Sequence, residues 1–237
     1  RSMLIQTQGL TKIYGSHTVL VDIDLTIGEG EQVAITGPTQ AGKTTLLYLL
    51  SGIVRPSSGT VILDGRDLSE MSRRQLQGLR RERFGFIFQS EQLLPELQVL
   101  ENVALPLLLQ GFGRAEAKQR ALKELQRLGL EDISRQMTAG LSPALAARVA
   151  IARALVTRPQ IIFADQPTAL LDPVSGQETM QALSLAAART HATLLVSTVN
   201  PQVAAWCQRT ITLRDGLIAQ DSRRESPSET VFQVEDA

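Results

Sequence analysis

Residues 37–44 are the feature of this 237-residue chain that most constrains its fold. They read Gly-Pro-Thr-Gln-Ala-Gly-Lys-Thr and match the phosphate-loop pattern G-x-x-x-x-G-K-[ST]. The apolar run 32–36 before them predicts a strand, and the leucine-rich run 45–50 after them predicts a helix. This order of strand, loop and helix turns the backbone N–H groups of the loop toward an anion. An ordinary glycine-rich turn is the alternative, and the flanking elements disfavour it.

The loop residues predict a site for a nucleoside triphosphate. Lys43 can reach the outer phosphates, and the hydroxyl of Thr44 can bind a magnesium ion. The residues expected to hold the nucleotide here are Gly37, Pro38, Thr39, Gln40, Ala41, Gly42, Lys43, Thr44 and Thr45.

Composition narrows the possible partners. The chain has 24 basic and 24 acidic residues. This neutral balance disfavours a nucleic-acid partner, because proteins that bind nucleic acids usually carry a basic surface. The single cysteine, Cys207, excludes an internal disulfide and fits a reducing cytoplasm. We find no signal peptide and no apolar run long enough to cross a bilayer, so we expect a soluble protein. Arg1 and Ser2 precede Met3; we interpret them as a cloning remnant and leave them out of the fold prediction.

The remaining pattern alternates strands and helices. Strands are predicted at 4–14, 18–27, 60–63, 84–88, 160–164 and 193–197, and a hairpin at 210–220 that turns at Asp215-Gly216. Residues 99–157 and 173–188 have helical patterns, and the tail from Asp221 is polar and expected to be loose.

This order predicts an α/β fold with a phosphate-loop NTPase core. The core would have a largely parallel sheet, an antiparallel β subdomain and an inserted helical subdomain. We expect one domain over 1–237, with the core at 1–90 and 159–220, the helical subdomain at 91–158 and the tail at 221–237.

Asp165 ends an apolar run at 161–165 and has two possible roles. Its carboxylate can hold the magnesium ion beside the Thr44 hydroxyl, as in other phosphate-loop ATPases. Alternatively, it caps the helix that follows.

Several segments together resemble the ATPases of ATP-binding cassette (ABC) transporters over nearly the whole chain. They are the phosphate loop, Phe88-Gln89, the Leu-Ser pair at 141–142 with the run 148–155, and the run 165–172. The runs 93–97 and 99–103 are similar to the lipoprotein-release and macrolide-export branch. The resemblance implies ATP and Mg²⁺ as ligands, transmembrane subunits and a second ATP-binding subunit as partners, and a cytoplasmic position on the inner face of the membrane. A small phosphate-loop kinase is the alternative, but it gives 148–155 and 165–172 no role.

The resemblance also implies roles for individual residues. Tyr14 would stack on adenine, although simple packing is an alternative for a tyrosine near a strand end. Gln89 would contact the magnesium ion and the attacking water. Residues 90–109 would dock onto a membrane subunit, or else form ordinary core. Ser142 would begin the helix that closes over ATP held by the second subunit.

The sequence departs from the family pattern at three single positions and in one segment. Gln166 stands where the family has a glutamate that polarises the attacking water. The amide of glutamine cannot accept a proton, and general-base catalysis typically contributes ~10²–10⁴-fold to the rate. Val199 replaces a histidine that contacts the γ-phosphate. Residues 142–145 read Ser-Pro-Ala-Leu where the family has Ser-Gly-Gly-Gln, although Ser142 and a proline still predict a helix start. Gln40 replaces a glycine and is expected to narrow the loop or strain its backbone.

These departures predict a subunit that binds Mg-ATP and hydrolyses it poorly or not at all. Two alternatives stay open. One is a scaffold that no longer binds nucleotide, which Gln40 favours and the intact Lys43, Thr44 and Asp165 oppose. The other is an active transport ATPase in which Gln166 is an engineered change.

Overall fold

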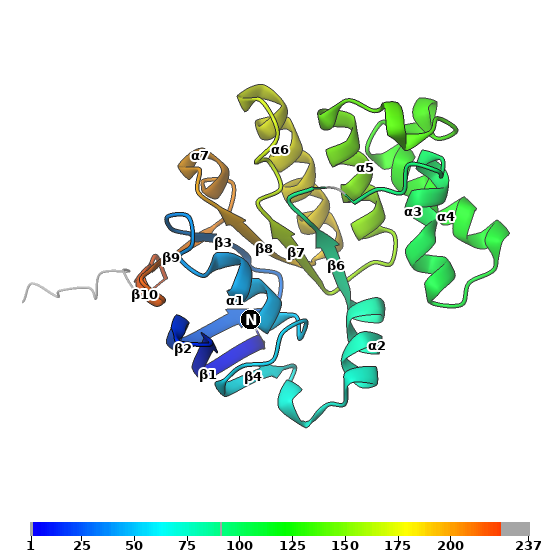
Figure 1. Ribbon diagram of the computed structural model, residues 1–237. Coiled ribbons are helices and arrows are strands. Elements are labelled where there is room, and N and C mark those ends of the chain that lie inside the picture. Colours follow the sequence, from blue (N-terminus) through cyan, green and yellow to red (C-terminus); the bar gives the residue numbers. More distant parts are fainter. Residues whose placement is uncertain (1, 91, 224–237) are drawn as a thin grey trace, which may run out of the picture.

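The structure is a computed structural model that describes residues 2–90 and 92–223. Its centre is a six-stranded sheet with the order β10-β9-β3-β8-β7-β6 (Figure 1). All neighbours in it are parallel except the terminal pair β9–β10, so the expected largely parallel sheet is confirmed. Its strands are β3 (Gln32–Thr36), β6 (Phe84–Ile87), β7 (Ile161–Asp165), β8 (Thr193–Thr198), β9 (Arg209–Arg214) and β10 (Leu217–Asp221).

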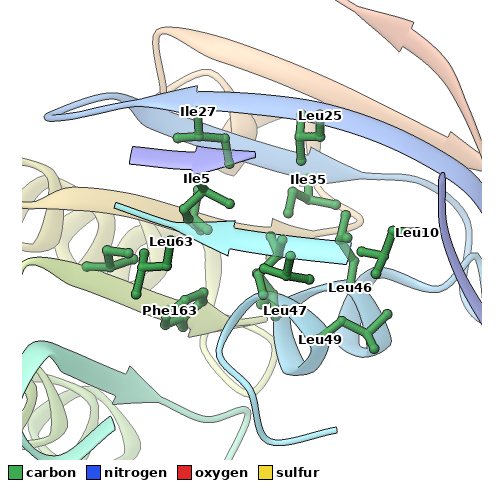
Figure 2. Close-up of a cluster of buried hydrophobic side chains, with 14 of the residues drawn as sticks. Ile5, Leu10, Leu25, Ile27, Ile35, Leu46, Leu47, Leu49, Leu63 and Phe163 are labelled. Carbon is green, nitrogen blue, oxygen red and sulfur yellow. The ribbon is translucent and has the colours of Figure 1, made fainter. Parts of the chain in front are cut away.

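A second sheet of four antiparallel strands has the order β2-β1-β4-β5. Its strands are β1 (Met3–Tyr14), β2 (His17–Gly28), β4 (Ser58–Leu63) and β5 (Arg66–Asp67). Helix α1 (Lys43–Leu50) packs between the two sheets, and Figure 2 shows Leu46 and Leu47 of α1 in one apolar cluster with Ile5 of β1 and Phe163 of β7. The expected antiparallel subdomain is therefore present.

Both faces of the central sheet are covered, which explains why its strands read as continuous apolar runs. Along β7, Ile161 and Phe163 face the α1 side, while Ile162 and Ala164 face the opposite side. That opposite face is covered by α5 (Pro143–Leu155), α6 (Pro173–Thr190) and α7 (Pro201–Ala204).

Three helices pack around a separate apolar cluster, which includes Val103, Leu107, Leu125 and Val149. They are α3 (Val99–Leu109), α4 (Arg114–Arg127) and α5, with the short 3-10 turns η2 (Glu131–Ile133) and η3 (Thr138–Gly140) between α4 and α5. The helical pattern expected at 99–157 is confirmed, whereas the division of the chain at 91 and 158 stays a prediction. Within residues 2–90 and 92–223, no helix is both long enough and apolar enough to cross a bilayer.

Helix α2 (Arg73–Arg83), preceded by the 3-10 turn η1 (Leu68–Glu70), was not expected from the sequence. It begins with a capping box: the backbone N–H of Gln75 donates to Ser72 Oγ, and the Ser72 N–H donates to Gln75 Oε1. Ser2 was left out of the fold prediction, yet its carbonyl accepts a hydrogen bond from Glu29 N–H at 3.0 Å.

The predicted hairpin is confirmed, and its turn residues Asp215 and Gly216 both have positive φ, 51° and 77°, as a tight hairpin turn requires. The prediction that Asp221 starts a loose tail is wrong. Asp221 ends β10 and is 5% exposed, because its carboxylate accepts from Arg209 Nε at 2.9 Å and Nη2 at 2.8 Å. Residues 224–237 of the expected tail lie outside the described residues.

A buried ion-pair network surrounds Arg209. Its Nη1 donates to Thr26 O at 2.8 Å and lies 3.3 Å from Glu31 Oε2, which joins β9 to the turn before β3. Burial alone would lower the pKa of Arg209, but the hydrogen bonds and charges of Asp221 and Glu31 outweigh it and raise the pKa. The network therefore fixes the end of β10, the edge strand of the central sheet, to β9 and to the turn before β3.

Candidate nucleotide-binding site

The phosphate loop is pressed against two neighbouring strands, and its glycines make this possible. Gly37 has φ 146°, and a Cβ there would lie 2.3 Å from the carbonyl oxygen of Leu213 on β9. Gly42 has φ 97°, and a Cβ there would lie 2.7 Å from a methyl carbon of Leu20 on β2. Any side chain at these two positions would push the loop away from the sheets.

The start of α1 fits an anion. Its N-cap residue is Gly42, which offers no side-chain cap, and its first turn contains no acidic residue. The helices α2, α5 and α6 are each capped by a side chain, from Ser72, Ser142 and Asp172 respectively. The first N–H groups of α1 and its positive dipole end are therefore available to phosphate oxygens.

Lys43 is buried inside the loop. The residue is 4% exposed, and Nζ donates to Gly37 O at 2.9 Å and to Pro38 O at 2.7 Å. Burial lowers the pKa of Lys43, and the nearby charge of Asp165 partly offsets this. The ammonium group is thus held where the loop curves, without a direct ion pair to a carboxylate among the described residues.

Two of the three predicted magnesium ligands, Thr44 and Asp165, lie side by side. Thr44 Oγ1 donates to Asp165 Oδ1 at 3.0 Å and to Oδ2 at 3.1 Å. A hydroxyl and a carboxylate are the hard oxygen ligands that Mg²⁺ prefers, so this pair fits the ion. The alternative that Asp165 caps the next helix is wrong, because α6 is capped by Asp172.

Ser197 is a site residue that the sequence did not reveal. It lies opposite Asp165 in the parallel register of β7 and β8, and its hydroxyl donates to Asp165 Oδ1 at 2.6 Å. Ser197 Oγ in turn accepts a hydrogen bond from the Gln166 N–H at 3.0 Å. Ser197 therefore fixes both the carboxylate and the backbone of the next residue.

Two of the departures from the expected pattern lie at this edge of the sheet. Gln166 follows β7 with φ 46°, a left-handed conformation that its hydrogen bonds to Ser197 maintain. It lines a cavity of about 400 Å³ together with His17, Val19, Gln40, Gly42, Lys43, Thr44 and Thr45. Val199 follows β8 and is 55% exposed. The amide of Gln166 and the apolar side chain of Val199 thus occupy the positions where the family resemblance implies a general base and a hydrogen-bond donor.

Gln40 bears out the expected backbone strain. It has φ 66°, a conformation that favours glycine, and its side chain is exposed on the cavity wall. His17 also lines this cavity, and no sequence signal pointed to it.

The comparisons with known proteins agree with this geometry. The profile of the ABC transporter family matches residues 20–169, which is more than half of the chain. This chain belongs to the ABC transporter family.

Two curated relatives place this cassette more closely. It is 39% identical over 218 residues to the lipoprotein-releasing system ATP-binding protein LolD of Bacteroides thetaiotaomicron, covering 92% of this chain and 100% of that one. It is 40% identical over 236 residues to the macrolide export ATP-binding/permease protein MacB of Marinobacter nauticus, covering 98% of this chain. The cassette spans only 36% of the length of that macrolide-export protein.

A solved structure shares the fold. The dimeric post-hydrolysis state of the ATP-binding cassette MJ0796, bound to ADP and Pi, matches with a TM-score of 0.84 and 35% identity, over 92% of this chain and 97% of that one. The α/β fold described above is therefore that of an ABC ATPase cassette.

The predicted site residues Tyr14, Gln89 and Ser142 are not among the residues that line this cavity. Tyr14 ends β1 and is 49% exposed, with Lys12 Nζ 4.8 Å from the ring centre, so it is not packed in the core. Gln89 is exposed just beyond β6, which pairs in parallel with β7 and so ends at the same edge as Asp165. Ser142 caps α5, and its hydroxyl accepts from Leu145 N–H at 3.3 Å, which confirms the expected helix start.

Proposed function

We propose that this cassette is the ATP-binding subunit of a transporter of the lipoprotein-release or macrolide-export type, and that it binds Mg-ATP but hydrolyses it slowly or not at all. One observation carries the proposal: at one edge of the sheet, the groups that would bind ATP and metal are intact, while the groups at the catalytic positions are altered. Lys43, Thr44 and Asp165 keep the chemistry for phosphate and metal, while Gln166 follows Asp165 directly.

Binding follows from the groups at the start of α1. The uncapped N–H groups and Lys43 would hold the phosphates, and Thr44, Asp165 and Gln89 would hold Mg²⁺. When bound, the ion neutralises charge on the phosphate oxygens. Tyr14, exposed at the end of β1, would stack on adenine.

Slow hydrolysis follows from two side chains. The amide of Gln166 cannot accept a proton from water, and a missing general base costs ~10²–10⁴-fold in rate. Val199 has no hydrogen-bond donor for a γ-phosphate oxygen. Because groups that act together are not additive, we do not multiply the two losses.

The partners are inferred from surface and relatives. A cleft of about 400 Å³ lies beside β6 and α3, with Phe86, Phe88, Leu105 and Leu109 in its lining. Leu109 is 65% exposed, and this apolar surface supports docking of a membrane subunit on segment 90–109. The cassette would then lie at the cytoplasmic face of the membrane. A second ATP-binding subunit, identical or different, would bring its own Ser142-like helix start to the nucleotide, in line with the dimeric relative.

The test measures equilibrium binding of Mg-ATP to the purified chain, with Lys43→Ala as control. We expect binding that the control abolishes. Turnover is then compared for the unchanged chain, Gln166→Glu, Val199→His and the double variant, with activity expected to rise most in the double variant. Brisk hydrolysis by the unchanged chain refutes the proposal that this cassette hydrolyses ATP slowly or not at all. Brisk hydrolysis by the single variant Gln166→Glu favours an active ATPase with an engineered glutamine.

A scaffold without nucleotide is the second candidate, and the backbone of Gln40 favours it. A strained, exposed glutamine in the loop stands beside the cavity that ATP would enter. If the unchanged chain fails to bind ATP while Gln40→Gly binds it, the loop is vestigial and the scaffold function replaces the first proposal.

A further inference from the structure

Helix α2 concentrates positive charge that the nucleotide site does not use. Its eleven residues read RRQLQGLRRER, with five arginines and one glutamate, in a chain whose formal charge is zero. Leu76 and Leu79 are its buried residues. Figure 1 shows α2 beside the lower end of β6, away from the carboxyl edge of the sheet where the nucleotide site lies.

One face of α2 borders a cavity of about 390 Å³. Arg73, Gln77 and Arg80 are spaced four and three residues apart, so they share a helix face, and all three line this cavity. Arg55, which follows the end of α1, lines it from the other side. The remaining lining residues are Gly52, Ile53 and Leu76. We call this cavity the arginine pocket.

Two of its guanidinium groups are held in place by backbone carbonyls. Arg80 Nη1 donates to Gly52 O at 2.8 Å, and Arg55 Nη2 donates to Met71 O at 2.9 Å. Each guanidinium carries five N–H donors, so these single bonds orient the groups and leave most donors for another acceptor. The pocket is therefore pre-organised to bind a ligand with several acceptor oxygens.

The pocket lacks a counter-charge. Its lining contains no carboxylate, and none of Arg55, Arg73 and Arg80 forms an ion pair within the part of the chain that the structure describes. Arg209, by contrast, is buried with two carboxylates. Arg80 is half-buried, and burial lowers its pKa. Gathering three like charges without a partner is unfavourable, and an anion would relieve that repulsion.

We infer that the arginine pocket binds a phosphoryl group and is a second anion site separate from the phosphate loop. Guanidinium groups match the paired oxygens of a phosphate, and the pocket has room for a phosphate ester as well as the bare ion. The phosphoryl group has two possible sources, free phosphate or the headgroup of an anionic phospholipid. Neither depends on ATP binding at the phosphate loop.

The test uses the full chain carrying Lys43→Ala, so that the phosphate loop does not contribute. Binding of inorganic phosphate is measured by calorimetry, and binding to vesicles of phosphatidylglycerol in phosphatidylcholine by co-sedimentation. In this background Arg73→Gln is compared with Arg74→Gln, since both residues are exposed on α2 and only Arg73 lines the pocket. Unchanged far-UV circular dichroism and unfolding temperature confirm that both variants fold.

We expect Arg73→Gln to weaken binding about tenfold, the effect of losing one charge-assisted contact, and Arg74→Gln to change it little. Phosphate binding without vesicle binding assigns the pocket to a free phosphate, and vesicle binding alone assigns it to a lipid headgroup. The inference is overturned if neither probe binds, or if the two variants weaken binding equally.

Discussion

Replacing Asp221 by alanine tests how strongly the buried ion pairs hold β10 to the sheet. The side chains of Arg209 and Asp221 are 7% and 3% exposed, and removing one partner of a buried pair costs about 3–5 kcal/mol. Arg209 keeps Glu31 at 3.3 Å, so we expect the low end, about 3 kcal/mol. For a chain of this size, about 2–4 °C is lost per kcal/mol, which gives a fall in Tm of about 6–12 °C.

The matched control is Glu116→Ala. It removes the Glu116–Arg120 pair on α4, which has a shorter N–O distance of 2.7 Å, but its side chains are 50% and 46% exposed. Exposed pairs of this kind contribute about 0.5 kcal/mol or less, so the control should shift Tm by no more than about 2 °C.

Urea unfolding followed by circular dichroism and by the fluorescence of the single tryptophan, Trp206, measures both variants. We expect the midpoint of Asp221→Ala to fall with an unchanged slope, because the surface exposed on unfolding stays the same. Equal midpoint shifts for Asp221→Ala and Glu116→Ala would refute the reasoning that burial makes this network strong.

Three further predictions concern single side chains. Ser197→Ala removes the hydroxyl that donates to Asp165 at 2.6 Å, so the Mg²⁺ concentration needed for ATP binding should rise about tenfold while binding in EDTA is unchanged. Titration of ATP binding with Mg²⁺ measures this concentration, and Ser197→Thr, which keeps a hydroxyl, should return it to the value of the unchanged chain. Burial raises the pKa of Cys207 to about 12, so a thiol reagent at pH 8 should label it slowly in the native chain and fully in urea; rapid native labelling contradicts this. Hydrogen bonds from Ser175 lower the pKa of Asp172 below its ordinary 3.8, so its cap stabilises α6 above that pH and is lost as pH falls through the lowered value. Below pH 3.8 the unfolding midpoint of Asp172→Ala should therefore approach that of the unchanged chain. A difference in midpoint that persists in strong acid would show that the ionised carboxylate is not what stabilises α6.

The strands and the phosphate loop were predictable because their signals are local. Alternating polar and apolar residues and continuous apolar runs both indicate strands, and the glycines at 37 and 42 are part of the phosphate-loop pattern. Helix α2 was missed because only Leu76 and Leu79 are buried, which leaves almost no apolar period to detect. The usable signal was the capping box of Ser72 and Gln75.

The site was predictable up to the contacts that cross between strands. The size of Gln40 was enough to predict strain, and its positive φ confirms it. Ser197 reads as one more residue of a buried strand, and only the pairing of β7 with β8 brings its hydroxyl to Asp165. Asp221 was misjudged for a similar reason, since its partner Arg209 is supplied by the register of a hairpin.

The place of α1 between the two sheets has a consequence for cooperativity. Because the apolar cluster around Leu46 and Leu47 draws on both sheets, the antiparallel sheet loses its core when the helix leaves, while the central sheet keeps only the cluster on its opposite face. Loss of α1 is therefore expected to unfold the antiparallel sheet and to uncover one face of the central sheet, while α3 and α4, which pack with α5 in a separate cluster, can open on their own. A ligand bound at the first turn of α1 would protect amide hydrogens in both sheets against exchange, far beyond the atoms that it touches.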